Sequence, residues 1–156
     1  MKSVHVLSVR KNTDSHIAAL EADYLKRLRP FCAVELTDIR ATYADGSPIA
    51  QVIAKEAELF KKKLPARATV IALHESGKSY SSREFSDWFG KTLGSADGPL
   101  AFVIGGAYGL SEDLIRGAKT VVSLSKMTFT HEFARLILLE QLYRAAQIAR
   151  GTDYHK

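Results

Sequence analysis

The segment LAFVIGGAYG, residues 100–109, decides the fold of this chain, because an apolar run stops abruptly at a pair of glycines. The run LAFVI at residues 100–104 carries no polar side chain, which is typical of a parallel strand covered by helices on both faces. Gly105 and Gly106 follow directly, and glycine permits a sharp turn or a close approach of the backbone to a ligand. The segment therefore predicts a buried strand that opens into a glycine loop.

Further apolar runs on both sides of this segment have the spacing of strands and of amphipathic helices. Strands are expected over residues 3–10, 32–40, 69–73, 100–104 and 119–125. Helices are expected over residues 15–28, 49–64 and 81–93, with a short helix capped by Ser111 and a last helix from residue 129 or 130 to 150. Strands that alternate with helices predict an α/β fold with a mainly parallel sheet.

The composition of the chain is that of an ordinary globular protein. It has 156 residues, of which 46% are hydrophobic and 25% are charged, and this length predicts one domain over residues 1–156. No apolar run approaches the roughly 20 residues that cross a bilayer, and the first residues lack the features of a signal peptide. We therefore expect a cytoplasmic protein that has no membrane partner.

Cys32 is the only cysteine, which excludes a disulfide within the chain and a cysteine-based metal cluster. It lies in a run of alternating apolar residues, so we expect a buried, unreactive thiol rather than a nucleophile. No metal is expected.

The net charge of +5 mildly favours a polyanionic partner such as RNA. The candidate contacts are Arg10, Lys11, Lys26, Arg27, Arg29 and Arg150, and each is explained equally well by an ordinary solvated surface. The run Lys61-Lys62-Lys63 ends a predicted helix, where favourable interaction with the helix dipole explains it better than RNA does.

Three predicted strands end in loops that are candidates for one ligand pocket. In open α/β sheets, ligands bind outside the carboxyl ends of the strands. The three exits are Leu73-His74, residues 104–106 and residues 124–130. The loop GGAYG matches neither GxGxxG nor a Walker A motif, which argues against a phosphate cradle. Taken alone the glycines indicate a turn, whereas the three exits together favour a small-ligand pocket.

The last predicted helix is apolar around most of its circumference, and such a helix is buried on more than one side. At the end of so small a domain, one of these sides is expected to meet another subunit. Glu140 and Arg144 are four residues apart, so they form either an ordinary helix ion pair or a pair that holds a polar substrate. His131 and Arg135 have the same spacing and form a second candidate pair.

The motifs FVIGGAYGLS, SLSKMTFTH, LLEQLYRA and GTDYHK follow one another at matching separations, and MKSVHVLSVRK, EADYLKRL and VIALHESGK precede them. Over the whole chain the sequence resembles the RlmH family, small SPOUT-class methyltransferases that methylate N3 of a pseudouridine in 23S rRNA. Two positions depart from the family pattern. Ala107-Tyr108 replace Pro or Ser followed by a small or acidic residue, and Thr130 replaces Pro.

The resemblance implies a SPOUT α/β knot, with a mainly parallel five- to six-stranded sheet flanked by helices and a C-terminal trefoil knot. It implies S-adenosylmethionine (S-adenosyl-L-methionine) as cofactor, a homodimer, and a substrate in the helix 69 hairpin of 23S rRNA within the assembled 70S ribosome. The cofactor-binding residues that it implies are Leu73, Gly105, Gly106, Leu124, Ser125, Lys126, Met127, Thr128, Phe129 and Thr130.

The resemblance also places Arg144, Tyr154 and His155 against the nucleotide, although the tail of a chain often frays. The N3 proton must leave, so we expect His155 to act as a base or relay, with water as the alternative. Arg144 would donate to the ring carbonyls and Tyr154 would orient or stack on the base. The alternative functions are a ribosome-associated factor without catalysis and a small-molecule enzyme that uses no RNA.

Overall fold

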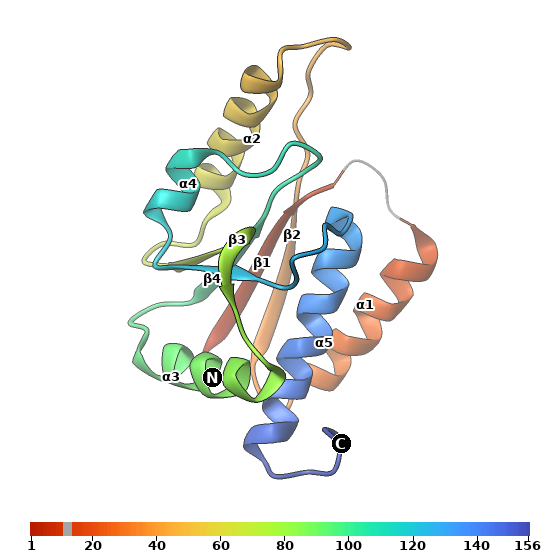
Figure 1. The fold of residues 1–156 in the computed structure, drawn as a ribbon, viewed down its shortest axis with the longest axis vertical. Helices are drawn as coiled ribbons and strands as arrows, with labels where there is room; N and C mark the ends of the chain where they lie inside the picture. Colours follow the sequence, from red (N-terminus) through yellow and green to blue (C-terminus); the bar gives the residue numbers. More distant parts are fainter. Residues whose placement is uncertain (11–13) are drawn as a thin grey trace.

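The computed structural model describes residues 1–10 and 14–156 and contains a five-stranded sheet in the order β2-β1-β4-β3-β5 (Figure 1). All neighbouring strands are parallel. The strands are β1 (Ser3–Val9), β2 (Ala33–Ile39), β3 (Thr69–Ser79), β4 (Leu100–Ile104) and β5 (Thr120–Ser123). The predicted α/β fold with a mainly parallel sheet is therefore confirmed, whereas the C-terminal knot stays a prediction.

Helices cover both faces of this sheet (Figure 1). They are α1 (Ser15–Leu28), α2 (Ile49–Lys63), α3 (Ser82–Ser95), α4 (Glu112–Gly117) and α5 (His131–Ala149). α1, α3 and α5 share one core with Leu100, Phe102 and Ile104 of β4, while α2 and α4 share the other with Ala101 and Val103. Because β4 faces helices on both sides, its unbroken apolar sequence is required, as predicted.

Polar side chains begin most of the helices. Asp14 accepts hydrogen bonds from the backbone N–H groups of His16 and Ile17, and Ser81 forms a capping box with Glu84. Ser111 and Thr130 cap α4 and α5 in the same way. The sequence also offers Thr13 as a candidate N-cap of α1, and this residue lies outside the described residues.

The third strand is longer than the sequence predicts. β3 continues beyond Leu73 to Ser79, and Leu73 and Lys78 both pair with Val122 of β5, with an irregularity between them. The segment HESGK has no strand periodicity, so its extended form depends on pairing with a strand more than forty residues later. The exit of β3 is therefore a bulge held against β5 rather than a free loop.

Cys32 is 2% exposed, and burial raises the pKa of its thiol to about 11. The prediction of a buried thiol is confirmed, and the raised pKa keeps the sulfur protonated at neutral pH.

Across residues 1–10 and 14–156, no helix combines the length and apolarity needed to cross a bilayer.

Candidate functional site

A pocket of about 420 Å³ lies at the carboxyl ends of β3, β4 and β5. Its wall consists of Leu73 to Glu75, residues 104–110, part of the loop from Leu124 to Phe129, and His131 and Ala134 of α5. The volume lies in the range of roughly 300–1,000 Å³ that is usual for small-molecule sites. The three strand exits thus meet in one place.

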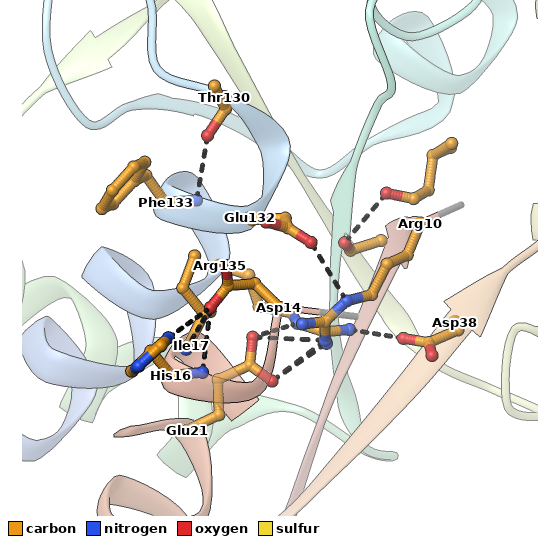
Figure 2. Close-up of polar contacts among 12 residues, drawn as sticks. Arg10, Asp14, His16, Ile17, Glu21, Asp38, Thr130, Glu132, Phe133 and Arg135 are labelled. Carbon is orange, nitrogen blue, oxygen red and sulfur yellow. Dashed lines mark hydrogen bonds and ion pairs between the residues drawn. The ribbon is translucent and has the colours of Figure 1, made fainter. Parts of the chain in front are cut away.

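Most residues expected to bind the cofactor line this pocket. These are Leu73, Gly105, Gly106, Leu124, Ser125, Met127, Thr128 and Phe129. The other two, Lys126 and Thr130, are exposed and are absent from the wall formed by the described residues. Thr130 instead caps α5, since its Oγ1 accepts a hydrogen bond from the N–H of Phe133 at 3.4 Å (Figure 2). Tyr108, at the other departure from the family pattern, also lines the pocket and is 52% exposed.

The glycine loop is a tight turn that presents backbone to the pocket. The N–H of Gly109 donates to the carbonyl of Gly106 at 3.0 Å. A Cβ atom on Gly105 would lie 2.5 Å from the carbonyl carbon of Gly109, so no side chain fits at this position. A ligand in the pocket therefore meets peptide groups here rather than side chains.

Three polar side chains in the pocket wall, those of His74, Glu75 and His131, are not among the cofactor-binding residues that the resemblance implies. The Nδ1 atom of His74 accepts a hydrogen bond from the N–H of Ser76 at 3.1 Å, so the neutral ring carries its hydrogen on Nε2. Thr128 Oγ1 donates to Glu75 Oε2 at 3.3 Å, which ties the β3 bulge to the loop after β5. His131 lies at the start of α5. Position at a strand exit or helix start was the signal available for all three.

No metal centre accompanies these groups in the part of the chain that the structure describes, because no three or more His, Cys, Asp or Glu side chains there are arranged to hold an ion.

A buried ion network holds the first turns of α5 against the rest of the molecule (Figure 2). Arg135 is 2% exposed, and its Nε and Nη2 atoms donate to the two carboxylate oxygens of Glu21 at 2.9 and 3.0 Å. Its Nη1 atom donates to Asp38 at 2.8 Å. Arg10 donates to Glu21 at 3.1 Å and lies 3.6 Å from Glu132. The network therefore joins α5 to α1, to β2 and to Arg10 directly after β1, beside the pocket wall.

This network corrects two expectations. Arg10 is 3% exposed, so it is not part of an RNA-binding surface, because its charge is directed at Glu21 and Glu132. Arg135 turns into the core while His131 lines the pocket, so the expected pairing of these two residues is wrong. Lys11 lies outside the described residues.

Arg144, Tyr154 and His155 lie together at the far end of α5. Arg144 Nε donates to Glu140 Oε1 at 3.0 Å, which confirms the predicted ion pair. The guanidinium lies 4.9 Å from the centre of the Tyr154 ring, and its Nη1 lies 3.4 Å from His155 Nδ1. The Tyr154 hydroxyl donates to the same Glu140 oxygen at 3.3 Å. One carboxylate therefore organises two of the three predicted catalytic residues.

The tail folds back onto α5 instead of extending away from it. Gly151 has a φ of 70°, its N–H donates to Ile148 at 2.9 Å, and the N–H of Thr152 donates to Gln147 at 3.1 Å, which is a Schellman motif. The Tyr154 ring then meets the Tyr143 ring edge-on at 4.9 Å. Burial raises the pKa of Tyr154 to about 12, so its hydroxyl keeps its proton at neutral pH and acts as a donor.

The pocket and the tail cluster are separate within one chain. Ala134 lines the pocket, and Arg144 follows ten residues later on the same helix. At about 1.5 Å per residue, these two positions are about 15 Å apart along α5. The two sets of predicted site residues are each brought together, but not with one another.

Two solved structures resemble this fold. One is a probable methylase family protein from Haemophilus influenzae, with a TM-score of 0.54 and 13% identity over 99% of this chain and 70% of that one. The other is a probable methyltransferase from Bordetella pertussis, with a TM-score of 0.51 and 14% identity over 93% of both chains. At these identities the likeness concerns the fold alone.

Sequence comparison is more specific. The family described as predicted SPOUT methyltransferase matches residues 1–155. Ribosomal RNA large subunit methyltransferase H of Dictyoglomus thermophilum is 39% identical over 153 residues, which cover 98% of this chain and 99% of that protein. The protein of the same name from Clostridium botulinum is 38% identical over 158 residues and 99% of both chains. These matches confirm the resemblance seen in the motifs, and the chain belongs to the SPOUT methyltransferase family.

Proposed function

We propose that this chain, acting as one domain over residues 1–156, is an S-adenosylmethionine-dependent methyltransferase of 23S rRNA. The target is N3 of a pseudouridine in the helix 69 hairpin of the assembled 70S ribosome in the cytoplasm. The observation that carries the proposal is the nearly full-length match to ribosomal RNA large subunit methyltransferases H in a chain with a backbone-lined pocket. The tail motif GTDYHK, which is one of the motifs that carry the family resemblance, supports pseudouridine as the target nucleotide.

The pocket residues fit S-adenosylmethionine. Leu73, Leu124 and Phe129 offer apolar surface to the adenine, and the peptide groups around Gly105 offer hydrogen bonds. When bound, the cofactor supplies a methyl group on an already activated sulfonium centre. The remaining task of the protein is to place the base beside it and to stabilise the charge that develops on the base.

Gly105→Ala is expected to weaken cofactor binding, because the added Cβ meets the backbone of Gly109 rather than a flexible side chain. Overpacking of this kind destabilises a packed conformation by roughly 1–3 kcal/mol. A cost of this size in the loop conformation that binds the cofactor corresponds to a rise in Kd of about 5- to 150-fold. Calorimetry with S-adenosylmethionine measures this change. Gly90→Ala in α3 is the matched control, because its Cβ would meet nothing within 4 Å. Equal affinity of the two variants would remove the glycine loop from the cofactor site.

We propose further that the active unit is a homodimer in which the tail of one subunit completes the pocket of the other. The roughly 15 Å between Ala134 and Arg144 along α5 prevents the two clusters of one chain from meeting. An apolar strip near the pocket is also left open, since Phe133 is 52% exposed and Leu136 and Ile137 are only partly buried. A second copy that covers this strip would bring its own tail towards the pocket.

In this arrangement Arg144 donates hydrogen bonds to the ring carbonyl oxygens, where negative charge develops as the N3–H bond breaks. Tyr154 keeps its proton and serves as a donor or as a stacking surface. Arginine is always a donor, so the lone pair of His155 Nδ1 faces Arg144. His155 therefore accepts the N3 proton only after turning away from Arg144, and a water molecule is the alternative acceptor.

Mass spectrometry of 23S rRNA from a strain that lacks the gene, and from the complemented strain, tests this function. The expected result is one methyl group that disappears and returns. An unchanged methyl pattern would overturn the proposal. Binding to ribosomes without binding of S-adenosylmethionine in calorimetry would favour the alternative of a ribosome-associated factor without catalysis.

A further inference from the structure

Four of the basic residues considered as RNA contacts lie at one end of the molecule. Lys26 and Arg27 belong to the last turn of α1, and Arg29 is its C-cap. Arg150 is the C-cap of α5. The two helices run side by side in the same direction and end near the C-terminus of the chain (Figure 1). All four side chains are exposed.

Aromatic rings hold two of these arginines in place. The guanidinium of Arg150 lies 4.3 Å from the centre of the Phe31 ring. That of Arg27 lies 5.6 Å from Tyr24 and 5.8 Å from Tyr143. Phe31 in turn meets Tyr143 edge-on at 6.2 Å. These distances are those of cation–π contacts, so the arginines are ordered before any partner binds.

Helix-dipole stabilisation explains only part of this arrangement. It accounts for cations in the last turn of α1, and Asp23 forms an ion pair with Arg27 at 2.9 Å. Neither effect places the guanidinium of Arg150 over the half-buried ring of Phe31, 4.3 Å from its centre. A guanidinium fixed by its flat face directs its N–H edges outward, and this fork matches the oxygens of a phosphate.

The same aromatic cluster leads directly to the tail. The Tyr143 and Tyr154 ring centres are 4.9 Å apart, and the guanidinium of Arg144 lies 4.9 Å from the centre of the Tyr154 ring. A chain of contacts through Tyr143 therefore joins the residues proposed to meet the target base to Arg27 and Phe31.

We infer that Lys26, Arg27, Arg29, Phe31 and Arg150, here called the arginine–aromatic surface, bind the RNA strand that flanks the target base. The arginines contact its phosphates, and Arg150, with one face on Phe31, offers the other face to an unpaired base. Unpaired loop nucleotides are recognised in this way, by stacking on aromatic rings or guanidinium planes and by contacts to the backbone. This inference rests on the proposed rRNA substrate.

The test compares two triple variants with the same loss of charge. In the first, Arg27, Arg29 and Arg150 are each replaced by Gln. In the control, Lys61, Lys62 and Lys63 are replaced by Gln, because they end α2 on the opposite face of the sheet. Methylation of ribosomes is measured over a range of salt concentrations, together with cofactor affinity and melting temperature.

The first variant is expected to raise KM for ribosomes about tenfold or more while cofactor affinity stays unchanged. The logarithm of the affinity falls with the logarithm of the salt concentration, and each lost phosphate contact makes this decline shallower by about 0.7 for a single strand. Three lost contacts therefore make it shallower by about 2. The lysine control should match the wild type. Equal KM values and equal salt slopes for the two variants would overturn the inference.

A second variant separates stacking from charge. Phe31→Leu keeps every cation but removes the ring under Arg150, so it should raise KM several-fold with the salt slope unchanged. An unchanged KM would contradict the role of the ring. Failure of the wild-type protein to methylate ribosomes would instead count against the proposed function, which keeps the two failures distinct.

Discussion

Arg135→Met is expected to lower the free energy of unfolding by about 3–5 kcal/mol, the usual cost of removing one partner from a buried ion pair. The variant leaves Glu21 and Asp38 without their shared guanidinium, and Glu21 is only 4% exposed. Denaturation in urea, followed by circular dichroism, measures the loss. Since Arg135 lies one residue after Ala134 in the pocket wall, cofactor affinity should fall as well.

Two controls define the origin of this effect. Arg116→Met removes an exposed arginine that pairs with Glu112 at 3.2 Å and Asp113 at 3.8 Å, and such surface pairs contribute about 0–1 kcal/mol. Arg135→Lys keeps the charge but loses the two-point contact with Glu21, so its loss should be intermediate. A loss below about 1 kcal/mol in Arg135→Met would show that the network does not hold α5 in place.

The loss should also depend on pH. Burial raises the pKa of Glu21, against the opposing charge of Arg10. In Arg135→Met one countercharge is gone, so the folded-state pKa rises further above the unfolded value. A carboxyl group with a raised folded pKa loses stabilisation as the pH increases through that pKa. The difference between variant and wild type should therefore be largest near neutral pH and shrink as the pH falls toward about 5.

Arg144→Gln is expected to slow single-turnover methyl transfer about 10²- to 10³-fold, the usual effect of removing a donor to a developing negative charge. Cofactor affinity should not change, because Arg144 is proposed to contact the target base rather than the cofactor and is absent from the pocket wall of its own chain. Rapid-quench measurements with labelled cofactor on ribosomes report the rate, and calorimetry reports the affinity. Arg116→Gln, at an exposed arginine of α4 that lines neither the pocket nor the tail cluster, serves as the control for loss of charge.

Mixing two impaired variants, at a cofactor concentration too low to saturate Gly105→Ala, tests whether the site crosses the subunit boundary. A dimer with one Gly105→Ala and one Arg144→Gln subunit contains one intact site only if pocket and tail come from different chains. Random mixing then restores about a quarter of wild-type activity, because half of the dimers are mixed and each has one working site. If each site lay within one chain, no mixture would recover, and the proposed dimer arrangement would be wrong.

The sequence predicts elements well where local pattern and local chemistry agree. The helix over residues 15–28 has the observed bounds, because its apolar spacing begins directly after the capping Asp14. The strand over residues 100–104 also has the observed bounds, since an all-apolar run of this length is typical of a strand covered by helices on both faces. The pocket follows from the same reasoning, because parallel strands bring their exits to one edge.

Long-range partners account for what the sequence does not predict. The extension of β3 depends on β5, and the burial of Arg10 depends on Glu21 in the next helix. The spacing of His131 and Arg135 suggests a local pair, whereas the partners of Arg135 lie 97 and 114 residues away. Charge pattern along a helix reports which residues are neighbours on its surface, but not which of them faces a carboxylate from elsewhere in the fold.

The protonated thiol of Cys32 makes the chain suitable for site-specific labelling. With this sulfur 2% exposed and its pKa raised to about 11, maleimide reagents at neutral pH will select an introduced cysteine instead. A spin label at position 133, on the uncovered strip of α5, would then report the distance between two protomers by pulsed electron paramagnetic resonance. The native background needs no removal, so the dimer geometry becomes measurable in solution and on the ribosome.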